Sequence, residues 1–151
     1  MQTQLAAAGR PLPLEAYQHA PALDFARENL RVLIVNEDMR SADALKSTLH
    51  ALGYFTTLTA YSARRALVAA ADFSPSVALV DLELPDMTGY QLAHELRSHL
   101  RGHVRKVPLL AISEPHVFGH FELARAAGFM GCLAKPVRPQ ELNCILRKLQ
   151  R

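Results

Sequence analysis

Four residues that could do chemistry each stand at the end of a short apolar run. Asp81 ends the run at 77–80 and precedes a segment that contains proline and glycine. Three other apolar runs end in the same way, at Glu37 in an acidic turn, at Ser113 and at Lys135. An apolar strand that stops at a polar residue and a turn places that residue at a sheet edge, facing a crevice. These four residues are therefore candidates for one common site.

The residue types indicate phosphoryl chemistry. Carboxylates crowded in one crevice repel each other and stay ionised when a cation joins them. Mg²⁺ takes one or two carboxylates together with phosphate and water, and Glu37 and Asp81 supply that number. Lys135 adds a positive charge of the kind that binds phosphate, and Ser113 adds a hydroxyl. Such a set can form and hold an aspartyl phosphate, because the cations neutralise the transferring group while the carboxylate attacks in line.

The segments between these residues alternate between strand and helix patterns. Strands are expected at 31–35, 54–59, 77–80, 107–112 and 132–134, and helices at 41–52, 62–71, 90–99, 116–127 and 139–149. Near-continuous apolar strands between helices imply a parallel sheet that is covered on both faces. We predict an α/β, doubly wound, flavodoxin-like (βα)5 fold with strand order 2-1-3-4-5. Strands one and three are neighbours in that order, so Glu37 and Asp81 share a crevice.

The length and composition favour one domain with a sizeable core, since the chain has 151 residues. Residues 1–30 are rich in Ala, Gln and Pro, and we expect a linker or flexible N-terminal tail there, with a short helix near 23–29. The domain proper is expected at 31–151. No apolar run is long enough to span a bilayer and nothing resembles a signal peptide. We therefore expect a cytoplasmic protein whose domain makes no membrane contact.

The charge and the cysteines carry little functional signal. A net charge of +3 is too small to favour direct nucleic-acid binding. The densest basic patch is expected to be a solvated helix end and loop; it consists of Arg97, Arg101, Arg105 and Lys106. Cys132 and Cys144 have no metal-ligand spacing and are expected to be small core residues.

Residues 31 to 150 resemble the receiver domain of two-component response regulators. The matching features are the acidic turn after the first strand, Asp81 with Pro85 and Gly89, Ser113 after the fourth strand, and the pair Lys135-Pro136. Each motif is weak alone, but the four agree with that family in order and spacing along the whole domain.

The resemblance implies a role for each candidate residue. Asp81 would be the phosphoacceptor, Glu37 a direct Mg²⁺ ligand, and the backbone carbonyl of Glu83 a further ligand. Ser113 would be the switching hydroxyl, and Lys135 would bind the phosphoryl group. A histidine kinase or a histidine phosphotransfer domain would be the phosphoryl donor, and a downstream protein partner would read the result.

Three residues depart from the family pattern. Asn36 replaces an acid, so Mg²⁺ should bind more weakly, although Asn36 can still hydrogen-bond a metal-bound water. Glu114 follows Ser113 where the family has a small residue, and its bulk and charge should slow phosphorylation and hydrolysis. Cys132 lies three residues before Lys135, where the family carries a Tyr or Phe that swings inward on phosphorylation. A cysteine cannot reproduce that swing.

Two functions therefore stay open. The first is a phosphoacceptor receiver, either stand-alone or the terminal receiver of a hybrid histidine kinase. The second is a degenerate receiver that acts as a phosphorylation-independent protein-interaction module, which the three departures favour. Neither is an enzyme beyond taking part in its own phosphorylation and slow dephosphorylation. A phosphatase of the haloacid dehalogenase type, suggested by Asp81-Leu82-Glu83, is disfavoured because that family carries its nucleophile on the first strand.

Overall fold

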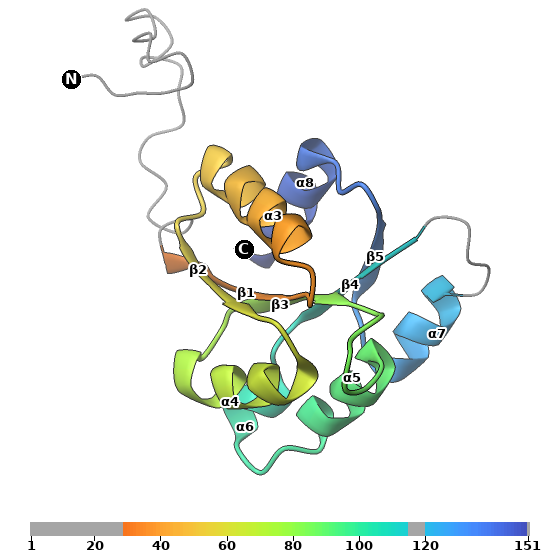
Figure 1. Ribbon diagram of the computed structural model, residues 1–151. Coiled ribbons are helices and arrows are strands. Elements are labelled where there is room, and N and C mark those ends of the chain that lie inside the picture. Colours follow the sequence, from red (N-terminus) through yellow and green to blue (C-terminus); the bar gives the residue numbers. More distant parts are fainter. Residues whose placement is uncertain (1–28, 115–119, 151) are drawn as a thin grey trace, which may run out of the picture.

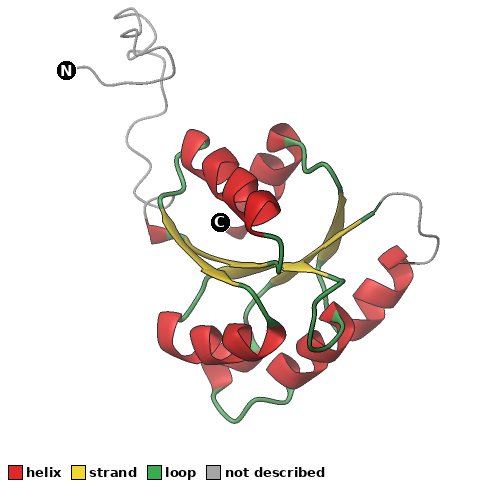
Figure 2. Cartoon of the chain, in the orientation of Figure 1, coloured by secondary structure: helices red, strands yellow, loops and turns green. Residues whose placement is uncertain are grey.

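A parallel sheet of five strands forms the centre of the molecule, and helices cover both of its faces (Figures 1 and 2). The computed structural model describes residues 29–114 and 120–150. Most of the expected N-terminal tail, 1–30, and the start of the expected helix at 116–127 lie outside the described residues.

The strand order confirms the predicted α/β, doubly wound architecture. The order in the sheet is β2-β1-β3-β4-β5, and every neighbouring pair is parallel. The strands are β1 (Arg31–Val35), β2 (Thr56–Ala60), β3 (Val77–Asp81), β4 (Leu109–Ser113) and β5 (Gly131–Ala134). All residues of β3 and β4 are buried, as expected of central strands that are packed on both faces.

The helices divide between the two faces of the sheet (Figure 1). The helices are α3 (Met39–Ala51), α4 (Ala63–Phe73), α5 (Gly89–Arg97), α6 (Gly102–Arg105), α7 (His120–Ala127) and α8 (Pro139–Leu149). Helices α3 and α8 share one apolar cluster with the sheet, and α4, α5 and α7 share the other. Side-chain caps begin three helices: Asp38 caps α3, Ser62 caps α4 and Thr88 caps α5.

Two strands begin later than the sequence pattern predicted. Strand β2 begins at Thr56 rather than at Tyr54, which is fully buried in the cluster beneath α3 and α8. The Tyr54 hydroxyl lies 3.3 Å from Asn143 Oδ1. Strand β4 begins at Leu109 rather than at Val107, because Pro108 has no N–H to donate to a ladder. The short helix α6 was not predicted, since the four residues of α6 are too few to show a period.

Two expectations about individual side chains were wrong. Arg97 is not simply solvated: its guanidinium donates to the carbonyls of Arg105 and Val107, both at 2.8 Å, and to that of Gly128 at 3.0 Å. This half-buried group ties the end of α5 to α6 and to the turn after α7, and burial lowers the pKa of Arg97. Cys144 is exposed on the outer face of α8, whereas Cys132 is half-buried.

The backbone at Gly89 leaves no room for a side chain. A Cβ there would lie 2.8 Å from the Leu82 Cα and 3.0 Å from the Asp81 carbonyl oxygen. The backbone N–H of Gly89 also donates to the Leu82 carbonyl at 2.9 Å. The first residue of α5 is thus held against the strand end that carries Asp81.

We predict that Gly89→Ala lowers the free energy of unfolding by about 1–3 kcal/mol, because backbone atoms must move to admit the methyl group. Gly102→Ala is the matched control, since the nearest atom there is the flexible end of Arg105 at 3.5 Å. Urea unfolding followed by circular dichroism measures both variants. Equal stability of Gly89→Ala and the unmodified protein would contradict the close approach.

Candidate functional site

Asp81 and Lys135 form an ion pair at the carboxyl edge of the sheet. The Asp81 side chain is buried, and its Oδ2 accepts a hydrogen bond from Lys135 Nζ at 2.7 Å. Its Oδ1 accepts from the backbone N–H of Glu83 at 2.9 Å. Both carboxylate oxygens of Asp81 are therefore held in place by donors.

The register of the sheet brings the candidate residues to one edge. Val35 pairs with Val80, so Asn36 follows β1 at the level where Asp81 ends β3. Ser113 pairs with Ala134, and the backbone N–H of Lys135 donates to the Ser113 carbonyl at 2.9 Å. Parallel strands align their carboxyl ends, so residues far apart in the chain meet there.

Lys135 also faces a second carboxylate. Its Nζ lies 3.8 Å from Glu114 Oε1, and the peptide bond from Lys135 to Pro136 is cis. Burial alone would lower the pKa of Lys135, but the hydrogen bond to Asp81 and the charges of Asp81, Glu114 and Glu83 outweigh it, and the net pKa is raised. Lys135 therefore carries its positive charge at neutral pH.

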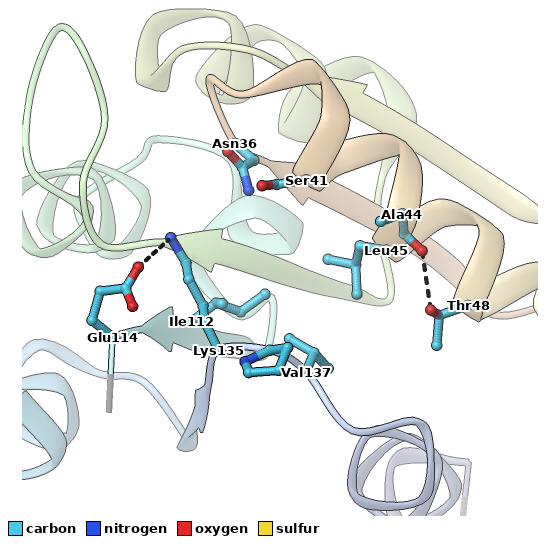
Figure 3. A pocket seen from close by; sticks show the side chains of 10 residues that line it. Asn36, Ser41, Ala44, Leu45, Thr48, Ile112, Glu114, Lys135 and Val137 are labelled. Carbon is cyan, nitrogen blue, oxygen red and sulfur yellow. Dashed lines mark hydrogen bonds and ion pairs between the residues drawn. The ribbon is translucent and has the colours of Figure 1, made fainter. Parts of the chain in front are cut away.

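A hollow of about 370 Å³ opens beside Lys135. Figure 3 shows Lys135 and Glu114 at one rim, Asn36 and Ser41 across from them, and the side chains of α3 along the wall. The lining along α3 and after β5 is largely apolar; it includes Ala44, Leu45, Pro136 and Val137. The ion pair thus borders an open concave surface.

In the acidic turn after β1, two side chains form local hydrogen bonds and one is exposed. Asn36 is buried, and its Oδ1 accepts from the N–H of Asp38 at 2.9 Å. Asp38 caps α3 by accepting from the N–H of Arg40 at 3.3 Å and from the Ser41 hydroxyl at 2.7 Å. Helix capping therefore engages the Asp38 carboxylate, which leaves the exposed Glu37 as the acid of this turn that is available to a cation.

The side chains alone do not supply a complete set of metal ligands. Within residues 29–114 and 120–150, no three His, Cys, Asp or Glu side chains lie close enough together to hold a metal. A cation here would need oxygen atoms from the backbone and from water as well as from Asp81 and Glu37. Such a mixed oxygen set suits Mg²⁺, which keeps several waters in protein sites.

The Ser113 hydroxyl points to a partner that the sequence did not indicate. Ser113 is buried, and its Oγ lies 3.3 Å from Cys132 Sγ on the neighbouring strand β5. Ser113 and Lys135 are thus adjacent in the sheet, but the hydroxyl contacts Cys132. The structure joins Asp81 directly to Lys135 and places Ser113, Asn36 and Glu37 at the same edge.

Asp86 supports the loop after Asp81, a role that the sequence analysis missed. Its two carboxylate oxygens accept from the backbone N–H groups of Ala63 and Arg64, both at 2.9 Å. These N–H groups lie in the first turn of α4, where they have no acceptor within the helix itself. Such a helix start favours an anion. An acid in a Pro- and Gly-containing loop indicates such a cap only weakly, because the N–H groups that donate to it lie 23 and 22 residues earlier.

A family model of the response regulator receiver domain matches residues 32–147. The chain belongs to this family. Receiver domains are signalling modules of two-component systems, and solved members share the parallel fold of this chain.

Solved receiver structures superpose on most of the chain. The chemotaxis response regulator CheY4 of Vibrio cholerae has a TM-score of 0.70 and 26% identity, covering 80% of this chain and 98% of the other. The receiver domain of a sensor histidine kinase of Pseudomonas aeruginosa PAO1, which has a magnesium ion coordinated in its active-site cleft, has a TM-score of 0.71 and 26% identity, covering 80% and 97%.

Curated relatives are longer than this chain. Regulatory protein AtoC of Escherichia coli K12 is 34% identical over 118 residues, which are 78% of this chain and 24% of AtoC. The sensor histidine kinase AtsR of Burkholderia thailandensis is 25% identical over 135 residues, 86% of this chain and 21% of AtsR. The chain therefore spans about a quarter of the length of these relatives. None of the described helices is long and apolar enough to cross a membrane.

The cap by Asp86 predicts a pH-dependent contribution to stability. The hydrogen bonds from Ala63 and then from Arg64 lower the pKa of Asp86 below its ordinary value of 3.8. A lowered pKa in the folded state stabilises the protein above the unfolded pKa, and this stability is lost as the pH falls through the folded pKa. Asp86→Asn should therefore be less stable than the unmodified receiver at pH 7, with a difference that narrows below pH 3.8.

Urea midpoints at pH 7 and at acidic pH measure this difference, and Asp72→Asn, an exposed acid later in α4, is the control. A difference between Asp86→Asn and the unmodified protein that does not change with pH would rule out the charge of Asp86 as its cause.

Proposed function

We propose that this receiver accepts a phosphoryl group on Asp81 from a histidine kinase or a histidine phosphotransfer domain, in a reaction that depends on Mg²⁺. One observation carries the proposal: a buried carboxylate at the end of the central strand pairs with Lys135 at 2.7 Å, beside an open hollow. Two loop carboxylates near the site, Asp38 and Asp86, cap helices. Asp81 is instead paired with a cation that can bind phosphate.

The chemistry follows from the two oxygens of Asp81. One oxygen attacks the phosphorus atom, while the bond between phosphorus and the donor histidine nitrogen breaks and the electron pair returns to the imidazole. Lys135 is already charged and lies within hydrogen-bond reach, so it can pass from the carboxylate to a phosphoryl oxygen without a change of protonation. Ser113, one strand away, offers a hydroxyl to another phosphoryl oxygen.

The residues present fit a Mg²⁺ site with few protein ligands. Asp81 and Glu37 would bind the ion directly, the Glu83 carbonyl would add a third oxygen, and Asn36 would act through a water. When bound, Mg²⁺ would neutralise charge on the transferring phosphoryl group. The likeness to the magnesium-holding receiver of the P. aeruginosa kinase supports this assignment. Because Asn36 carries no charge, the affinity for Mg²⁺ should be low.

The phosphoryl donor would dock on the hollow beside Lys135. An apolar lining from α3 and the segment after β5, next to a cation, suits a donor helix that presents a phosphohistidine. The domain would comprise 31–151, with 1–30 as a linker, and would contact neither nucleic acid nor membrane directly. Both response regulators and histidine kinases occur among its relatives, so a stand-alone receiver and the terminal receiver of a hybrid kinase are both open.

The decisive test is the intact mass of the protein after incubation with a small acyl-phosphate donor, with and without Mg²⁺. We expect one phosphoryl adduct that requires Mg²⁺ and is absent from Asp81→Asn. Asp72→Asn, an exposed acid on α4, is the matched control and should be labelled normally. A folded protein that forms no adduct would instead support the phosphorylation-independent interaction module.

We further predict that Glu114 slows phosphorylation. Its carboxylate lies 3.8 Å from Lys135 Nζ, where it competes for the lysine and repels the incoming donor anion. Removing one charge at such a distance changes the barrier by about 1 kcal/mol, or roughly fivefold in rate. Glu114→Ala should therefore raise the initial rate of adduct formation by that factor.

The control is Glu141→Ala, since Glu141 is an exposed acid in the first turn of α8. An unchanged or lower rate for Glu114→Ala would show that Glu114 does not obstruct the site. A comparison with Glu114→Gln separates the effect of charge from that of bulk.

A further inference from the structure

Strand β2 forms an open edge of the sheet. It stands first in the order β2-β1-β3-β4-β5, so within residues 29–114 and 120–150 only β1 lies beside it (Figure 1). The Ala60 carbonyl accepts from the N–H of Asn36, which fixes the backbone groups that face β1. Because successive residues of a strand point their backbone groups to opposite sides, those of Thr57 and Thr59 face outwards. This edge can therefore accept another strand.

The edge lacks the features that usually prevent two strands from pairing. Exposed edge strands commonly carry a charged residue, a proline or a bulge that blocks another chain. Strand β2 has the sequence Thr-Thr-Leu-Thr-Ala, with no charge and no proline, and it pairs with β1 in an unbroken register. Threonine also favours the extended conformation. The strand is thus open to pairing along its whole length.

Exposed apolar side chains are arranged symmetrically around this edge. Leu58, the middle residue of β2, is 39% exposed, and the two residues that flank the strand, Phe55 and Tyr61, are 63% and 37% exposed. A hollow of about 510 Å³ lies between Leu58 and helix α4, and Val68 also lines it. Val68 is the middle residue of α4 and is 64% exposed. Two central and two flanking apolar groups therefore share one surface.

A second copy of this chain fits the surface across a two-fold axis through Leu58. In the antiparallel pair that this axis generates, Thr57 would lie opposite Thr59 of the partner subunit, and their outward backbone groups would form about four hydrogen bonds in all. Phe55 would lie at the level of the partner's Tyr61, and the two Leu58 side chains would meet at the axis. Because both subunits use the same surface, the contact closes on itself as a dimer.

Charge also favours the antiparallel arrangement. Arg64 and Arg65 lie in the first turn of α4, where the partial positive charge of the helix start disfavours a cation. In the antiparallel pair, the two α4 helices would run in opposite directions, with Val68 close to the axis. The arginines of each subunit would approach the C-terminal end of the other α4, whose free carbonyl groups carry partial negative charge. A parallel pair would instead bring all the arginines together.

We propose that the edge formed by β2 and the outer face of α4 is an interface between two copies of this chain. The inference does not depend on the proposed function, because β1 lies between this edge and the strand that carries Asp81.

The exposed apolar area predicts a weak dimer. With roughly 200 Å² for a large side chain, the four exposed apolar residues offer on the order of 400 Å² per subunit. Each partner in a stable complex buries about 800 Å². The dissociation constant should therefore be on the order of 100 µM, so the chain would be monomeric at low micromolar concentration.

The first test measures the average mass of the full chain by sedimentation equilibrium from about 5 to about 500 µM, a range that spans the expected dissociation constant. The mass should rise from that of a monomer towards that of a dimer. Leu58→Lys should raise the dissociation constant by about tenfold or more, because two like charges would lie opposite each other. Leu123→Lys, the same change at an exposed leucine on α7, is the matched control and should dimerise normally.

The second test examines the register by disulfide trapping under mild oxidation, in a Cys144→Ser background because Cys144 is exposed. Across the two-fold axis the two Cα atoms of residue 58 would lie about 4.5 Å apart, within the range of a disulfide. Leu58→Cys should therefore form a covalent dimer. Phe55→Cys is the control, since its two copies would lie about 20 Å apart along the strands although Phe55 is more exposed.

Each alternative outcome would overturn the proposal. A monomer at every concentration would do so directly. A dimer that Leu123→Lys disrupts and Leu58→Lys leaves intact would assign the contact to another face. Equal trapping of Leu58→Cys and Phe55→Cys would indicate random collisions rather than a two-fold pair. Circular dichroism establishes that each variant is folded, and the trapping result decides if Leu58→Lys is not.

Discussion

The ion pair between Asp81 and Lys135 is the interaction on which the site depends. It joins the central strand β3 to the segment after the edge strand β5, across 54 residues of sequence. Taking a carboxylate and an ammonium out of water costs free energy, which the short contact and the second donor on Asp81 offset. An ion pair of this kind is weak evidence for stability. In the proposed function it keeps the attacking carboxylate and the cation that binds the phosphoryl group together at an open edge of the sheet.

The loop between β3 and α5 holds this ion pair in place through its backbone. Gly89 lets the start of α5 approach the end of β3, and Asp86 fastens the same loop to the start of α4. Thr88 caps α5 from within the loop. The consequence is that Asp81 is attached to two helices on one face of the sheet, so a change at its carboxylate has a short physical path to α5.

Much of the fold and part of the site were predictable, because strands and helices leave local periodic patterns. The apolar runs predicted all five strands, with errors at the starts of β2 and β4 that trace to a buried tyrosine and a proline. The strand order is the one expected of the predicted flavodoxin-like fold. Asp81 and Lys135 were found by their places at strand ends, and they are in contact. The three hydrogen bonds of the Arg97 guanidinium and the helix cap by Asp86 were not predictable, since each depends on backbone groups that are distant in sequence.

The sequence by itself determined which residues stand at the carboxyl edge of a parallel sheet, since apolar periodicity and turn residues act over a few positions. It also determined the family, through the order of Asp81, Ser113 and Lys135. The tertiary structure decided how each side chain is used. It turned the Ser113 hydroxyl towards Cys132 and brought Glu114 to Lys135. Those choices depend on side-chain directions across neighbouring strands, which no local pattern encodes.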